Sequence, residues 1–204
     1  MLLADKFGRL ITELRIAITE NCNYKCVYCR TGSARANGGA PTFSDYLRMA
    51  DIFVRLGIRK IRITGGEPLL RKGVVGFVRE LSRLRAVDGG QLDLALTTNG
   101  HLLAGFARSL KEAGLMRVTV SMDAIDPSRF SRITRVPGAF DRVLAGIRAA
   151  RRAGLDPVKV NCVLVRGFNE NQIIPFGIFA REEGVCCVLS NSCLSKKAVF
   201  GLIT

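Results

Sequence analysis

Short apolar and β-branched runs alternate along the chain with longer segments in which apolar residues recur at helical spacing. The strand-like runs fall at residues 14–19, 60–64, 92–98, 117–122 and 158–165. The helical segments between them end at glycines, as helices commonly do, at Gly57, Gly114, Gly154 and Gly184. A repeated strand–helix unit predicts a parallel sheet joined by right-handed crossovers.

Polar and apolar residues also alternate inside each predicted strand, so each strand has one polar and one apolar face. The polar face would carry Arg15, Lys60, Arg62, Asp93, Thr97, Arg117, Ser121, Asp123, Lys159 and Asn161. Crossovers of one hand place all the helices on the other face and curl the sheet. We therefore predict an α/β fold, an incomplete (βα)6-type TIM-like barrel with a candidate sixth strand at 185–189.

The polar face must contact either water or a polar ligand held in the lumen, and we favour the lumen. Unpaired cations inside a protein are costly, so Arg15, Arg62 and Lys159 together indicate an anionic ligand such as a triphosphate. The alternative is that some of these bases pair with Asp93 or Asp123 in a structural network.

Three cysteines, Cys22, Cys26 and Cys29, follow the first predicted strand at C-x3-C-x2-C spacing. Thiolates suit zinc or an iron–sulfur cluster. A structural zinc site needs four ligands, whereas the only histidine is His101 and the next cysteine is Cys162. Three thiolates on a [4Fe–4S] cluster would leave one iron open to a ligand. The spacing therefore favours an iron–sulfur cluster over zinc, and polar residues between the thiols disfavour three unrelated core cysteines.

The sequence Gly65-Gly66-Glu67-Pro68 follows the second predicted strand. Glycines lack a side chain, so they would let the backbone approach a ligand closely, and Glu67 would offer a carboxylate. A tight turn between strand and helix would give the same pattern.

Composition places the chain among ordinary globular proteins, with 48% hydrophobic and 24% charged residues. We find no apolar stretch of about 18 residues and no signal peptide, so we expect a cytoplasmic protein without a membrane segment. Seven cysteines in such a chain indicate metal binding rather than disulfides.

The formal net charge of +14 makes an anionic partner plausible. Nucleic acid is disfavoured, because the basic residues are spread over predicted helices without aromatic side chains between them. A solvated basic surface accounts for most of them.

Several motifs now support a family resemblance. The cysteine spacing, with Tyr28 before the third cysteine, resembles the radical S-adenosylmethionine (SAM) superfamily. Five further blocks, in order, resemble MoaA, the GTP 3′,8-cyclase family of molybdenum-cofactor biosynthesis: 5–9 (DKFGR), 60–71 (KIRITGGEPLLR), 97–100 (TTNG), 120–123 (VSMD) and 157–161 (PVKVN). The match extends over roughly residues 5–184.

The resemblance implies a role for each matching residue. The cluster ligands would be Cys22, Cys26 and Cys29, the SAM contacts Tyr28, Gly66 and Ser121, and the GTP contacts Arg15, Arg62, Thr97 and Lys159. A [4Fe–4S] cluster and SAM would be the cofactors, GTP the substrate, and an external electron donor would be needed; a homodimer is left open. In this family the deoxyadenosyl radical abstracts the ribose 3′ hydrogen of GTP, and the sugar radical then attacks C8 of guanine.

The chain also departs from the family pattern. Arg30-Thr31-Gly32 stands where the family usually has Met-Pro. The family continues beyond about residue 185 into a region whose three cysteines hold a second cluster, and Cys186, Cys187 and Cys193 do not reproduce that pattern. We therefore divide the chain into a radical SAM partial barrel, 1–184, and a divergent or truncated tail, 185–204.

Three functions remain open at this stage. The first is a MoaA-type cyclase, with the alternative of a catalytically incomplete fragment that binds only the cluster and SAM. The second is a radical SAM enzyme with another substrate. The third is a basic module, without enzymatic activity, that binds metal or nucleic acid.

Overall fold

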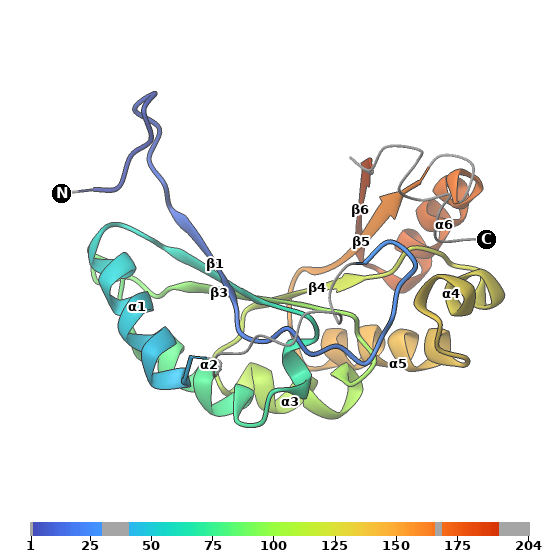
Figure 1. The fold of residues 1–204 in the computed structure, drawn as a ribbon, viewed down its shortest axis with the longest axis horizontal. Coiled ribbons are helices and arrows are strands. Elements are labelled where there is room, and N and C mark those ends of the chain that lie inside the picture. Colours follow the sequence, from blue (N-terminus) through green and yellow to red (C-terminus); the bar gives the residue numbers. More distant parts are fainter. Residues whose placement is uncertain (1, 30–40, 166–168, 192–204) are drawn as a thin grey trace.

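Six parallel strands form one sheet in which each strand lies beside its neighbour in the sequence (Figure 1). The computed structural model describes residues 2–29, 41–165 and 169–191. The strands are β1 (Glu13–Ala17), β2 (Lys60–Thr64), β3 (Asp93–Thr98), β4 (Arg117–Ser121), β5 (Val158–Leu164) and β6 (Cys186–Asn191). The five predicted strands and the candidate sixth are therefore confirmed.

The helices are α1 (Phe43–Arg55), α2 (Val74–Arg83), α3 (Leu103–Glu112), α4 (Pro127–Thr134), α5 (Ala139–Arg152) and α6 (Ile173–Glu183), with short 3-10 turns η1 (Pro68–Leu70) and η2 (Glu170–Gln172). The helix α4 was missed by the sequence analysis. Its signal was present, because Asp126 caps the helix through the N–H of Arg129 at 2.6 Å and Pro127 occupies the first helical position.

The helices follow the outside of the curved sheet. The segment after β1, which carries the three cysteines, passes between the strands of the sheet and α4 (Figure 1). On this helix-covered face many strand side chains are completely buried, among them Ile61, Leu94, Leu96, Val120 and Val160. Burying a large aliphatic side chain contributes about 1.5–3 kcal/mol, so this face supplies much of the stability of the fold. The predicted open, TIM-like (βα) arrangement is confirmed.

The opposite face, here called the open face, carries the polar residues of the alternating pattern. Its partly buried side chains include Lys60, Arg62, Asp93, Thr97, Arg117, Thr119 and Lys159, and Arg15 is exposed. The pairing register places Arg15 beside Arg62, and Thr119 between Thr97 and Lys159. The predicted separation of polar and apolar faces is thus confirmed.

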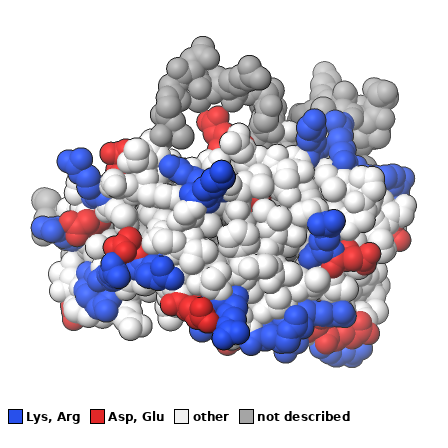
Figure 2. Space-filling model, turned by 90° about the horizontal axis from the view of Figure 1, so that it is seen from below, with Lys and Arg blue, Asp and Glu red and all other residues white. Residues whose placement is uncertain are grey.

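The outer helical surface carries charges of both signs (Figure 2). Arginines there pair with carboxylates on the same or the next helix, as in Arg83–Glu80 at 2.6 Å and Arg148–Glu183 at 2.6 Å. In the described part of the chain, no helix is long and apolar enough to cross a membrane.

The expected boundary between residues 184 and 185 falls at the turn between α6 and β6. Gly184 ends α6 in a left-handed conformation, and β6 then pairs with β5 along its whole length. Residues 186–191 are therefore part of the sheet, whereas the division into two units stays a prediction.

Candidate active site

The loop that follows β1, residues 18–29, carries the three thiols and is called the cysteine loop below. It starts as a continuation of β1, with the N–H of Ile18 donating to Thr64 O at 2.9 Å. It then reaches the end of α4, where Lys25 and Val27 donate to main-chain oxygens of residues 134 and 133 at 3.2 and 3.0 Å. The loop therefore spans the carboxyl ends of the strands, where parallel α/β folds place their sites.

An aromatic anchor fixes the middle of the cysteine loop. Tyr24 is buried and packs edge-on against Phe130. Its hydroxyl lies 3.1 Å from Nδ1 of His101. The histidine, distant from the cysteines in the sequence, is thus brought beside their loop.

Arg71 fixes the start of the cysteine loop. Its guanidinium donates to the main-chain oxygens of Ile18 and Pro41, the latter at 2.5 Å. The same group lies 4.3 Å from the ring centre of Phe43, within the range of a cation–π contact. The sequence analysis gave Arg71 no role.

Gly65 and Gly66 pack against the backbone of the cysteine loop. A Cβ atom at Gly65 would lie 2.4 Å from Thr19 O, and one at Gly66 would lie 2.4 Å from Asn21 O. The N–H of Gly66 donates to Thr19 O at 2.7 Å. The glycines therefore allow two backbones to meet, and Gly66 as a SAM contact stays a prediction.

Glu67 does not present a free carboxylate to a ligand, which corrects the sequence analysis. Its side chain is fully buried and accepts hydrogen bonds from Thr98 Oγ1 at 2.8 Å and from the main-chain N–H groups of Leu69 and Asn99 at 3.0 and 2.7 Å. Burial raises the pKa of Glu67 even though these bonds oppose the rise. Glu67 thus joins the ends of β2 and β3 beneath the cysteine loop.

The three thiols of the loop differ in exposure, since Cys22 and Cys26 are partly buried and Cys29 is exposed. Burial raises the pKa of Cys26 to about 12, with further contributions from the negative charges of Asp123, Cys29 and Cys22. Burial also raises the pKa of Cys22. Without a cation Cys22 and Cys26 therefore favour their neutral form, because burial and nearby negative charge both raise their pKa.

The chemistry of this donor set fits an iron–sulfur cluster. The thiols influence one another electrostatically and lie on one loop at the carboxyl edge of the sheet. Among the described residues, no three His, Cys, Asp or Glu side chains are arranged to hold a single metal ion. An iron–sulfur cluster does not need three sulfurs around one ion, because each thiolate binds its own iron.

Asp123, just beyond β4, connects the end of the cysteine loop to β5. The hydroxyl of Tyr28 donates to Asp123 Oδ2, and the N–H of Val163 donates to Oδ1 at 2.8 Å. Burial raises the pKa of Asp123, although both bonds oppose the rise. The hydroxyl of Tyr28 is thereby engaged, which leaves its ring and main chain for the predicted contact with SAM. The third predicted SAM residue, Ser121, lies beside Asn161 on the open face.

Glu13 neutralises part of the positive charge on the open face. It accepts from Arg62 Nε at 3.1 Å and pairs with Lys60 Nζ at 2.8 Å, while Arg62 also donates to Thr119 Oγ1 at 3.2 Å. The hydrogen bond from Lys60, followed by that from Arg62, lowers the pKa of Glu13. Arg62 is therefore already paired, which the sequence analysis did not foresee because it left Glu13 out of the alternating pattern.

A second pair on the same face involves Asp93, but its partner is Arg117 and not Arg15, Arg62 or Lys159, for which the alternative interpretation expected an aspartate partner. Arg117 donates to both carboxylate oxygens of Asp93, at 2.9 Å from Nε. No ion pair holds Arg15 or Lys159 within the described part of the chain. The described strands thus place two carboxylates, Glu13 and Asp93, on the open face. Five basic side chains lie on the same face, so it keeps an excess of positive charge: Arg15, Lys60, Arg62, Arg117 and Lys159.

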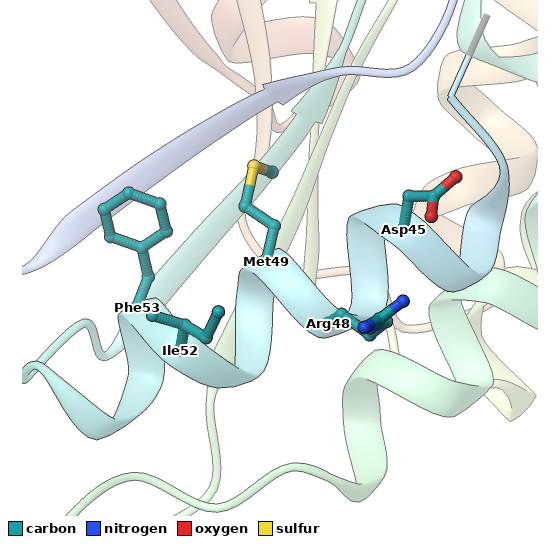
Figure 3. A pocket seen from close by; sticks show the side chains of 5 residues that line it. All are labelled: Asp45, Arg48, Met49, Ile52 and Phe53. Carbon is teal, nitrogen blue, oxygen red and sulfur yellow. The ribbon is translucent and has the colours of Figure 1, made fainter.

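A hollow also lies beside α1, lined by Asp45, Arg48, Met49, Ile52 and Phe53 (Figure 3). All five side chains come from one helix, and Figure 3 shows them pointing in different directions rather than toward a common point. It is therefore not a candidate active site.

The fold and the cysteine loop together define the class of protein. The family model of the radical SAM superfamily matches residues 16–176, and the chain belongs to this superfamily. The structure of Streptococcus suis SuiB bound to S-adenosylmethionine has a similar fold, with a TM-score of 0.76, 20% identity, and coverage of 92% of this chain and 42% of that one.

Relatives with much higher identity point to a particular branch. A GTP 3′,8-cyclase of Peptoclostridium acidaminophilum is 47% identical over 177 residues, which cover 85% of this chain and 53% of the relative. Another, from Thermodesulfovibrio yellowstonii, is 44% identical over 184 residues, which cover 88% and 56%. The predicted resemblance to this family is confirmed. The chain spans about half the length of the curated relatives it matches.

Proposed function

We propose that this chain forms the radical SAM part of a GTP 3′,8-cyclase, in which a [4Fe–4S] cluster and SAM generate the radical that acts on GTP. The observation that carries the proposal is the identity of 47% over 85% of the chain to a GTP 3′,8-cyclase. The third predicted function, a basic module without enzymatic activity, does not account for that identity.

The cysteine loop would hold the cofactors. In this proposal Cys22, Cys26 and Cys29 are the cluster ligands, and the cluster supplies an open iron for SAM and the electron that cleaves it. Tyr28, Gly66 and Ser121 contact SAM. Asp123 and the glycine pair fix the loop, so that SAM is oriented by backbone that is already in place.

The open face would bind the triphosphate of GTP through Arg15, Arg62, Thr97 and Lys159. Support comes from the excess of bases there and from the register that sets Thr97, Thr119 and Lys159 side by side. Arg15 and Lys159 are available for phosphate oxygens because no described carboxylate holds them. Arg62 would have to share its guanidinium between Glu13 and the phosphate.

The proposal includes an external electron donor, because the chain must be supplied with the electron that cleaves SAM. It includes no binding to a membrane or to nucleic acid, and it leaves open whether the protein forms a homodimer. Cytoplasmic location stays a prediction.

The test of the cluster ligands is anaerobic reconstitution followed by iron and sulfide analysis. Replacing Cys22, Cys26 or Cys29 by Ala should abolish the oxygen-sensitive cluster. Cys162→Ala is the matched control, because Cys162 is fully buried on the helix-covered face and should leave the cluster intact. A complete cluster in the Cys26→Ala protein would contradict the assignment.

The test of the substrate is turnover with SAM, GTP and a reductant under anaerobic conditions. SAM cleavage that depends on GTP would support the cyclase, and cleavage independent of GTP would support the second candidate, a radical SAM enzyme with another substrate. For these 204 residues assayed alone we expect 5′-deoxyadenosine with little cyclised nucleotide, because Cys186, Cys187 and Cys193 do not reproduce the family's pattern of ligands for the second cluster that fixes guanine. Stoichiometric cyclised nucleotide would refute this expectation.

A further inference from the structure

Asn99, the residue after β3, directs its side chain at the sulfur of Cys22. Its Nδ2 lies 3.8 Å from Cys22 Sγ, a distance compatible with a hydrogen bond to the large sulfur atom. The main-chain N–H of Tyr24 lies 3.4 Å from the same sulfur. The thiol of Cys22 therefore has two N–H donors, one local and one from a different part of the sheet.

The orientation of the Asn99 amide is fixed by its other partners. Oδ1 accepts the main-chain N–H of His101 at 3.0 Å, and Nδ2 donates to Asn23 Oδ1 at 2.7 Å. Exchanging the oxygen and nitrogen would bring two oxygens together at Asn23 and two donors together at His101. An amide nitrogen carries two hydrogens, so the second remains for Cys22.

The main chain of Asn99 is held from beneath by the buried carboxylate of Glu67. The N–H of Asn99 donates to Glu67 Oε2 at 2.7 Å, and Thr98 donates to the other oxygen at 2.8 Å. Asn99 is itself almost fully buried. The main chain of Asn99 is thus positioned by the ends of β2 and β3, whereas its amide group is oriented by His101 and by Asn23 of the cysteine loop.

We infer that Asn99 is a positioning residue whose N–H···S hydrogen bond to Cys22 raises the reduction potential of the cluster. The inference rests on the proposed role of Cys22 as a cluster ligand. Hydrogen bonds to the ligand sulfurs are among the factors that set the potential of iron–sulfur clusters. A donor stabilises the reduced cluster more than the oxidised one, because reduction adds negative charge that the sulfurs share.

The direct test is a reductive titration of the reconstituted cluster, followed by EPR, in wild-type and Asn99→Ala protein. A neutral hydrogen bond contributes about 0.5–1.5 kcal/mol, so we expect the equilibrium constant for reduction to fall about two- to tenfold in Asn99→Ala. A tenfold fall corresponds to about 59 mV for one electron. Asn99→Asp, which presents an oxygen to the sulfur instead of a donor, should lower the constant further.

Asn23→Ala is the matched control, because it removes the neighbouring partner of Asn99 without removing a donor to Cys22, and the N–H of His101 still orients the Asn99 amide through Oδ1. Its potential should equal that of the wild type. An equal shift in Asn23→Ala and Asn99→Ala, or no shift in Asn99→Ala and Asn99→Asp, would overturn the inference.

A second measurement covers the case in which the Asn99 variants fail to hold a cluster. In Asn23→Ala protein labelled with ¹⁵N at asparagine, pulsed EPR of the reduced cluster should still show a weak ¹⁵N coupling, and its absence would overturn the inference. A failure of the proposed function would give a different result, because the Cys22→Ala protein would then retain a complete cluster.

Discussion

Alternate residues of the same strands form the two faces of the sheet, yet one face is apolar and packed against helices and the other is polar. On the helix-covered face, Leu96 is fully buried among aliphatic neighbours, whereas the next residue, Thr97, lies on the open face among hydroxyls and bases. The first face gains stability from burial, and the second retains charge that folding alone does not require. The difference shows that the helix-covered face stabilises the fold, and it is the reason why we place the proposed ligand site on the open face.

The largest expected effect is on stability and should separate the two faces. Leu96→Ala removes a buried side chain and should lower the free energy of unfolding by about 2–5 kcal/mol. Thr97→Ala, one residue away on the open face, should lower it by less than about 1 kcal/mol. Urea unfolding of both variants checks this. Equal losses would mean that the open face is also part of the packed core.

The next effect concerns ligand binding on the open face. Lys159→Ala should weaken GTP affinity about ten- to a hundredfold, because a hydrogen bond to a charged group contributes about 1.5–3 kcal/mol, while SAM affinity stays nearly unchanged. Isothermal titration calorimetry with each ligand measures both. Lys111→Ala removes the same charge from the exposed surface of α3 and serves as the control. Equal losses of GTP and SAM affinity in Lys159→Ala would argue against a phosphate site there.

The smallest effect is a pH dependence of stability that arises from Glu13. Lys60 and then Arg62 hold its pKa below the ordinary value of about 4.3, so the folded state binds fewer protons there than the unfolded state. The stabilisation is present above that pH and is lost as the pH falls through the lowered pKa. Because Glu13 is partly exposed, it amounts to less than about 1 kcal/mol.

Glu13→Gln removes this titration and provides the check. Between pH 6 and pH 3 the wild type should lose slightly more stability in urea than the variant does. Identical losses would show that the Glu13 pairs with Lys60 and Arg62 contribute nothing to folding.

The strands could be predicted well because their signal is local. Alternation placed β2 at its observed bounds, and glycines marked where α1, α3, α5 and α6 end. The helix α4 was missed because it is short, although the Asp126–Pro127 pair marks its start.

The contacts between loops could not be predicted, because they depend on which strand ends meet. Spacing alone identified the three thiols of the loop. It did not reveal that Glu67 is buried, that Asn99 reaches Cys22, or that Tyr28 bonds to Asp123. Each of these joins residues from different strands, so only the assembled sheet brings them together.

The meeting of the glycine pair with the cysteine loop has a consequence for protein engineering. Even a methyl group at Gly66 would collide with the backbone at Asn21, so Gly66→Ala would act as a wedge that pushes the thiols away from the sheet. For that reason the C-x3-C-x2-C segment cannot be transferred to another protein on its own. Transplanting it into another βα protein would require bringing the two glycines after the next strand as well.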